Sequence, residues 1–228
     1  MKLKWIMYIS KDTYLQKNNM KWKYINQDDT AEEQQEQAAP QYIINAAPSS
    51  GGAVTRSIEN NIYFYGDITE ANALELNSAL YDLDKKLSIT NVFLDIKPVI
   101  NLHINSYGGS LFAGLATVDV IRNLNSSVHS IIEGAAASAA TIISVACHKR
   151  SMGKYSKMLI HQLSSGTYGK YNELEDDMEN NKHLMQTIKS IYRTYTNVPM
   201  KKLDEILKHD LWFDSETCLN LGLVDEVN

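Results

Sequence analysis

Short runs of β-branched and aromatic residues alternate along this chain with segments whose apolar residues recur every three or four positions. The strand-like runs lie at 62–65, 100–104, 128–133 and 158–160, and helical spacing follows the first three of them. This order of strand, helix, strand, helix predicts an α/β fold with parallel strands. The loops that follow such strands gather at one edge of the sheet, so we expect a functional site there.

The longest helical pattern lies in the second half of the chain. Apolar residues from Leu174 to Tyr195 recur at three- and four-residue steps, which predicts an amphipathic helix over 171–197 that stops before Pro199. An apolar face of this length covers either the protein's own core or a second subunit. The pattern alone leaves both interpretations open.

Composition changes sharply near residue 55. The acidic and amide-rich stretch 27–37 is followed by Ala, Pro, Ser and Gly, a composition that buries too little to offset its ordering entropy. We expect ordered structure to begin at Asn61 and a polar loop to cover 85–98. Four segments are predicted: a flexible arm, linker or leader over 1–55, a head domain over 56–170, a handle helix over 171–199, and a return to the head over 200–228.

Charge and cysteine content narrow the class of protein. With 22 Lys and Arg against 27 Asp and Glu, the net charge of -5 does not favour nucleic acid or an anionic membrane. The apolar stretch 134–147 is too short to cross a bilayer, and the N-terminal segment is interrupted at Lys11 without a cleavage site. Cys147 and Cys218 form no disulfide framework, which predicts reduced thiols in the cytoplasm or an equivalent compartment such as plastid stroma.

Ser138 stands where a predicted strand turns into a predicted helix within a run of Gly and Ala. A hydroxyl at such a turn is exposed beside the unpaired N–H groups of the helix, as in a nucleophile elbow, although the G-x-S-x-G spelling is absent. Small residues in a row more often serve close packing of helices and strands. By itself this stretch therefore favours a structural serine.

Three further positions favour a catalytic rather than a structural role for Ser138. Gly109 lies in a Gly-Gly turn after the second strand, where the backbone can approach a ligand closely. His161 follows the strand at 158–160, which predicts an imidazole at the same sheet edge as Ser138. Asp210, between two apolar clusters, is either a helix cap or the partner that orients His161. His103 alternates with apolar residues along its strand and is predicted to be structural.

Four motifs in this order resemble the proteolytic subunits of the Clp protease, ClpP, from about residue 60 to the C-terminus. They are Asn105-Ser106-x-Gly108-Gly109, Gly134-x-Ala136-Ala137-Ser138, Met158-Leu159-Ile160-His161-Gln162, and Asp210 followed by Gly222-Leu223-Val224-Asp225.

The resemblance implies a serine endopeptidase site. Ser138 would be the nucleophile, His161 its general base and then acid, and Asp210 the residue that fixes the tautomer of His161. The N–H groups of Gly109 and Ala139 would form the oxyanion hole. The walls along an extended substrate would be Ser110, Leu111, Leu163 and Ser164.

The resemblance also implies the architecture and the assembly. We expect a ClpP/crotonase-like head of repeated β-β-α units in a spiral, a protruding helical handle, and two stacked heptameric rings that enclose a chamber. Unfolded polypeptides and short peptides would be cleaved inside it. An AAA+ Clp unfoldase would use the ATP, so this subunit is expected to need no cofactor and no metal.

The chain departs from the family pattern at several points. Tyr107 and Leu163 stand where proline is usual, Lys208 and His209 replace an acidic residue and arginine, and the loop 85–99 is longer. Residues 1–60 show no counterpart of the family's first helix and axial loop.

Two other classes of function are consistent with parts of the pattern. A crotonase-type acyl-CoA enzyme would use the oxyanion donors but leaves Ser138, His161 and Asp210 together unexplained, and a lysine-based peptidase does not account for His161. A catalytically silent ring subunit would keep the fold for assembly only.

Overall fold

The computed structural model describes residues 54–90 and 97–228. From residue 61 to residue 145 strands and helices alternate, as the hydrophobic pattern predicts. The strands are β1 (Val54–Ile58), β2 (Asn61–Tyr65), β3 (Val99–Ser106), β4 (Ser127–Ala137), β5 (Lys149–Met152), β6 (Lys157–Leu159), β7 (Trp212–Phe213) and β8 (Glu226–Val227). The helices are α1 (Glu70–Thr90), α2 (Leu111–Asn123), α3 (Ala139–Val145), α4 (Tyr171–Tyr195), α5 (Met200–Ile206) and α6 (Ser215–Asn220).

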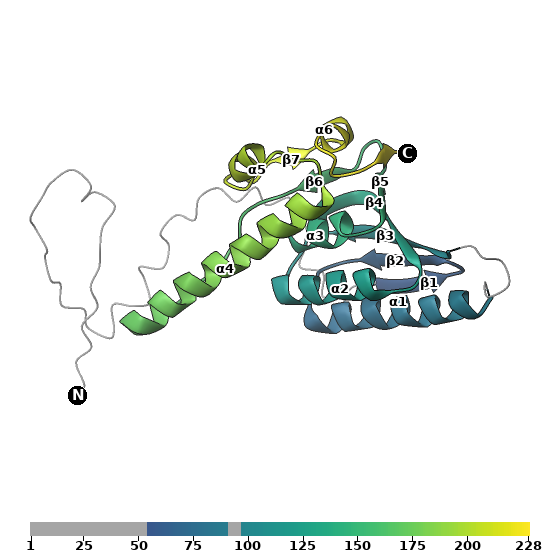
Figure 1. The fold of residues 1–228 in the computed structure, drawn as a ribbon, viewed down its shortest axis with the longest axis horizontal. Coiled ribbons are helices and arrows are strands. Elements are labelled where there is room, and N and C mark those ends of the chain that lie inside the picture. Colours follow the sequence, from purple (N-terminus) through teal and green to yellow (C-terminus); the bar gives the residue numbers. More distant parts are fainter. Residues whose placement is uncertain (1–53, 91–96) are drawn as a thin grey trace, which may run out of the picture. The chain divides into compact units, whose positions relative to one another are not determined.

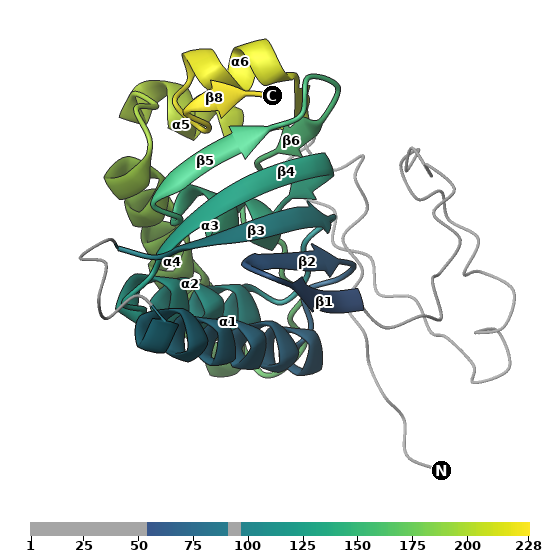
Figure 2. The same ribbon diagram turned by 90° about the vertical axis from the view of Figure 1, so that its right-hand side faces the viewer.

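The strands form one mixed sheet in the order β1-β2-β3-β4-β5-β8, of which Figure 1 labels β1 to β5 and Figure 2 also labels β8. Neighbours from β2 to β8 pair in parallel, whereas β1 pairs with β2 antiparallel. The far end of β4 pairs in parallel with β6, and β6 pairs antiparallel with β7. This mixed α/β architecture confirms the fold class and the parallel strands predicted from the sequence.

Helices pack against one face of the sheet, and no helix of the described residues covers the other, open face, as Figure 2 shows with the strands in front. Along β3 the side chains of Ile100, Leu102 and Ile104 are fully or almost fully buried, because every second residue of a strand points to the same face. His103 points to the other face, where Nδ1 lies 2.8 Å from Oε1 of Glu133. His103 thus makes structural contacts on the open face.

Several element boundaries differ from the predictions. Ordered structure does not begin at Asn61, because Val54–Ile58 already forms β1. The predicted loop starts too early, since α1 continues to Thr90. Strands β5, β7 and β8 were not predicted because runs of two to four residues show too little alternation to be recognised. The predicted arm over 1–55 lies, up to residue 53, outside the described residues, and so does 91–96.

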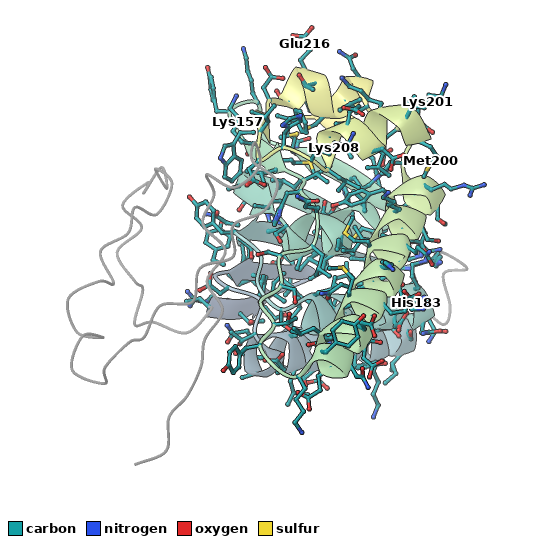
Figure 3. All side chains as sticks on the ribbon, turned by 90° about the vertical axis from the view of Figure 1, so that its left-hand side faces the viewer. Lys157, His183, Met200, Lys201, Lys208 and Glu216 are labelled. Carbon is teal, nitrogen blue, oxygen red and sulfur yellow. The ribbon has the colours of Figure 1, made fainter. Side chains whose placement is uncertain are left out.

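Helix α4 is buried only near its C-terminal end. Ile188 and Tyr192 are almost completely covered, while Leu174 and Met178 towards the N-terminal end are 40% and 58% exposed. The N-terminal half projects away from the sheet (Figure 1), and Figure 3 views the helix from this side, with His183 labelled on it. The apolar face therefore continues beyond the part that the protein's own core covers.

Arg150 on β5 holds the C-terminal part of the chain against the sheet. Its guanidinium donates to the carboxylate of Asp225, with Nη2 2.5 Å from Oδ1, and to the carbonyls of Gly222 and Tyr195. These bonds join β5, the end of α4 and the loop after α6. No helix in the ranges 54–90 and 97–228 is long and apolar enough to cross a membrane.

Candidate active site

Ser138 lies in the sharp turn between β4 and α3. Its φ and ψ of 54° and −126° are strained for a residue with a side chain. Two sets of hydrogen bonds hold this conformation. The Ser138 N–H donates to the carbonyl of Leu159 at 2.9 Å, and the Ser138 carbonyl accepts from the N–H of Thr141 at 3.0 Å and from its hydroxyl at 2.6 Å. Strain maintained in this way is typical of functional positions.

The turn between β3 and α2 lies directly against this elbow. Gly108 and Gly109 have φ values of 97° and 145°, and a Cβ on Gly108 would come within 2.7 Å of the Ser138 Cβ. Ile68 donates to the carbonyl of Gly108 at 2.8 Å and accepts from the N–H of Ser110 at 2.7 Å. Ile68 and Gly109 thus form a parallel bridge in which Ile68 bonds to the two neighbours of Gly109. The N–H of Gly109 itself therefore points away from Ile68. That N–H is therefore a backbone donor beside the serine.

His161 and Asp210 come together through strand pairing. Strand β6 ends two residues before His161, and its antiparallel partner β7 is paired so that Leu159 faces Trp212. His161 follows β6 by two residues and Asp210 precedes β7 by two residues, so this pairing brings the two side chains close to each other. Nδ1 of His161 and Oδ1 of Asp210 are 3.8 Å apart, and the Asp210 side chain is 79% exposed. This is a solvent-accessible charge pair when His161 is protonated, and it is longer than a hydrogen bond.

Ser138 and His161 line one cavity of about 250 Å³. Every other predicted site residue except Asp210 also lines it, including Gly109 and Ala139. Among the hydrogen bonds of the described residues, none joins the Ser138 hydroxyl to the His161 ring. Catalytic hydrogen bonds are often long in proteins without substrate and shorten when substrate binds.

The predicted substrate walls differ in what their side chains can offer. Leu111, Leu163 and Ser164 line the cavity. The hydroxyl of Ser110 is already engaged, because it caps α2 by accepting from the Ala113 N–H at 3.3 Å and donates to Glu70 at 2.8 Å. The backbone N–H of Ser110 is also engaged, because it donates to the carbonyl of Ile68 at 2.7 Å, and the Ser110 carbonyl accepts from the N–H of Gly114 at 3.1 Å. Ser110 therefore lines the cavity with polar groups that are already paired within the protein.

The sequence analysis missed four residues of the cavity wall: Ile142, Gln162, Ile188 and Tyr192. Ile142 follows Ser138 by about one helical turn, and Gln162 directly follows His161. Both could therefore have been predicted from their distance in sequence to the motif residues. Ile188 and Tyr192 lie on α4. The only sequence signal for them was that both belong to the apolar face of this helix, which indicates burial but not a place in the site. The base of the handle helix is thus part of the site.

A second, more open hollow of about 560 Å³ lies beside the C-terminal half of α1, lined by residues such as Tyr81, Asp84 and Asn125. It contains no histidine and no strained serine, so it offers no comparable chemistry. Within 54–90 and 97–228, no cluster of His, Cys, Asp and Glu is arranged to hold a metal ion.

Comparison with known proteins shows the family to which this chain belongs. The family model for Clp protease matches residues 57–228. An ATP-dependent Clp protease proteolytic subunit from Deinococcus radiodurans is 33% identical over 130 residues, which are 56% of this chain and 64% of that protein. The corresponding Bacteroides fragilis subunit is 29% identical over 176 residues, or 76% and 81% of the two chains.

A proteolytic subunit from Streptococcus mutans is 38% identical over 134 residues, covering 56% of this chain and 67% of the relative. The matched part of the Deinococcus protein is thus less than two thirds of its length. The family model, however, covers the whole described fold except part of β1. As the sequence motifs predicted, the chain belongs to the Clp protease family.

Proposed function

We propose that the chain is a serine endopeptidase that cleaves unfolded polypeptides and short peptides as a Clp proteolytic subunit. The observation that carries the proposal is the cavity that a strained serine and a histidine line together with Gly109 and Ala139. Family membership and the names of the relatives support the same reaction. The glycine turn alone would also suit a crotonase-type enzyme, but the family match favours the peptidase.

In the proposed reaction, the Ser138 hydroxyl attacks the carbonyl carbon of the scissile peptide bond while His161 takes its proton. The tetrahedral oxyanion is stabilised by the N–H groups of Gly109 and Ala139. Collapse of this intermediate breaks the C–N bond, and His161 gives the proton to the leaving amine. Water then hydrolyses the acyl-serine with His161 as the base, and Asp210 favours the protonated ring by its charge.

We further propose that the subunits assemble into heptameric rings, two of which stack around a chamber, and that an AAA+ Clp unfoldase supplies polypeptide. The unfoldase would consume the ATP, so this subunit carries no cofactor or metal in its reaction. The names of the relatives, which are ATP-dependent Clp protease subunits, support this division of work.

A reducing compartment, such as the cytoplasm or plastid stroma, is also part of the proposal. Cys147 and Cys218 are both free and buried. Burial raises the pKa of the Cys147 thiol to about 12 and that of the Cys218 thiol to about 12. Both therefore stay protonated and unreactive at neutral pH, which suits structural thiols.

The test is active-site labelling of the full-length chain. A fluorophosphonate probe should label the wild-type protein at Ser138, and Ser138→Ala should abolish both labelling and cleavage of a fluorogenic peptide while native mass stays unchanged. The loss is expected to exceed about a thousandfold, as is usual when a nucleophile of this class is removed. Ser78→Ala, an exposed serine of α1, is the control and should behave as wild type.

Equal labelling of Ser138→Ala would refute the assignment of the nucleophile. A wild-type protein that assembles but neither reacts with the probe nor cleaves peptide would instead be a catalytically silent ring subunit.

A further inference from the structure

A chain of hydrogen bonds runs from the handle helix to the backbone of the serine elbow. The Tyr192 hydroxyl on α4 lies 2.5 Å from Oγ1 of Thr141 on α3. The same Oγ1 lies 2.6 Å from the carbonyl oxygen of Ser138. Residues 51 positions apart in the sequence are thus joined at the site.

The direction of this chain follows from the number of protons. A carbonyl oxygen only accepts, so the single hydroxyl proton of Thr141 points to Ser138. Tyr192 must then donate its own proton to Thr141. Burial raises the pKa of Tyr192, outweighing the opposite effect of the bond to Thr141, so the phenol keeps its proton at neutral pH.

The two side chains are shielded from water. Thr141 is fully buried and Tyr192 is 1% exposed. Leaving a buried hydroxyl without a hydrogen-bond partner is unfavourable, so the pair favours the arrangement in which both bonds are made. The position of α4 is thereby linked to the orientation of the Ser138 carbonyl.

That carbonyl shares a peptide unit with a proposed catalytic donor. The peptide group between Ser138 and Ala139 is planar and trans, so its C=O and N–H point in opposite directions. Whatever holds the Ser138 carbonyl towards Thr141 therefore aims the Ala139 N–H to the opposite side, and Ala139 lines the cavity. The strained φ of Ser138 makes this peptide a place where an additional anchor matters.

We propose that Thr141 and Tyr192 are positioning residues that fix the Ser138–Ala139 peptide and so keep the oxyanion donor aimed into the site. This inference rests on the proposed peptidase function. It also makes the base of the handle helix part of the catalytic support, because a displacement of α4 would move Tyr192. Ile188, one turn earlier on α4, lines the same cavity beside it.

Substitutions of one functional group test the proposal in the full-length protein. Tyr192→Phe and Thr141→Val should each lower kcat for a fluorogenic peptide about three- to tenfold, while KM changes less than about twofold, because the donor acts on the tetrahedral state rather than on bound substrate. The second-order rate of fluorophosphonate labelling should fall in parallel. Thr141→Ser keeps the hydroxyl and should restore both rates to within about twofold of wild type.

Thr117→Val is the matched control. Thr117 is equally buried, on α2, and its hydroxyl donates to the carbonyl of Ala113 at 3.2 Å, away from the elbow. The kcat and the labelling rate of Thr117→Val should stay at the wild-type values. Native mass is measured for every variant, so that a loss of assembly is recognised, and if Thr141→Val does not fold, Tyr192→Phe alone decides.

Wild-type kcat in Tyr192→Phe, or a comparable loss in Thr117→Val, would overturn the inference. Ser138→Ala separates this result from the proposed function. If that variant is inactive while Tyr192→Phe is unaffected, only the role of the hydrogen-bond chain fails. If Ser138→Ala remains active, the peptidase assignment itself fails.

Discussion

At the scale of single residues, the site combines one tightly held group with one loosely held group. Ser138 is fixed by three backbone and side-chain hydrogen bonds in a strained conformation. Asp210, in contrast, is largely in water and 3.8 Å from the His161 ring. Two unit charges at this distance interact by about 1 kcal/mol in bulk water and by about 4 kcal/mol near a protein surface. The contribution of Asp210 to stabilising the protonated ring of His161 should therefore be modest.

We expect Asp210→Asn to lower kcat/KM for a short peptide about tenfold, far less than Ser138→Ala does. Because an exposed pair is screened by salt, the difference from wild type should narrow between 0.1 M and 1 M salt. The measurement is steady-state kinetics at both salt concentrations. Glu216→Gln, which removes an exposed negative charge on α6, is the control. A loss as large as that of Ser138→Ala, independent of salt, would contradict this prediction.

At the scale of secondary-structure elements, the contact between α1 and the start of β4 depends on a buried carboxylate. Asp84 on α1 is 7% exposed and accepts hydrogen bonds from the N–H groups of Ser126 at 2.6 Å and Asn125 at 3.3 Å. Burial by itself would raise the pKa of Asp84, but the hydrogen bonds from Ser126 and Asn125 outweigh it and hold the pKa below its usual value.

A carboxyl with a lowered pKa in the folded state stabilises the protein above its unfolded pKa, and this stabilisation is lost as the pH falls through the folded value. Asp84→Asn should thus lower the free energy of unfolding by about 1 to 3 kcal/mol at pH 7. The difference from wild type should shrink below the ordinary aspartate pKa of 3.8. Denaturant titrations at fixed protein concentration across this pH range provide the measurement.

Asp82→Asn, on the exposed side of the same helix, is the matched control and should change stability by less than about 0.5 kcal/mol. A constant difference between Asp84→Asn and wild type down to pH 2 would show that the charge of Asp84 is not what stabilises the contact.

At the scale of the whole molecule, the apolar face of α4 extends from the core to a part that the described chain leaves exposed. Met185 and Ile188 pack against the core, while Leu174 and Met178 on the same face are exposed. A continuous apolar face of this kind is typical of a surface that a second subunit covers. This face of α4 is the surface through which subunits would contact each other in the proposed assembly.

Met178→Glu places a charge on this face and should shift the protein towards smaller species, because burying an unpaired carboxylate is unfavourable. Sedimentation velocity over a range of concentrations measures the shift, and the dissociation constant should rise at least about tenfold. Asn180→Glu adds the same charge on the exposed polar side of α4 and should leave assembly unchanged. Unchanged assembly of Met178→Glu, or a monomeric wild-type protein at all concentrations, would contradict the proposed contact.

Much of this protein was determined by local sequence pattern. The alternation along 100–104 gave a strand with one buried face, and the strand-like runs at 128–133 and 158–160 predicted that Ser138 and His161 follow parallel strands. Such residues gather at one sheet edge whatever the details of packing. The elements β2, β3, β4 and α2, and the meeting of Gly109, Ser138 and His161 at one sheet edge, therefore follow from periodicity and turn chemistry. The roles of Ala139 and of the predicted substrate walls came from the resemblance to the Clp protease family.

Other features were decided only by the tertiary structure. Strand β7 has two residues and no recognisable pattern, yet its pairing with β6 brings Asp210 close to His161. The engaged hydroxyl of Ser110 and the contact of Tyr192 with Thr141 depend on helices far apart in the chain. Periodicity records which face of an element is buried. It does not record which partner covers that face, because long-range pairing is chosen by the packing of the whole fold.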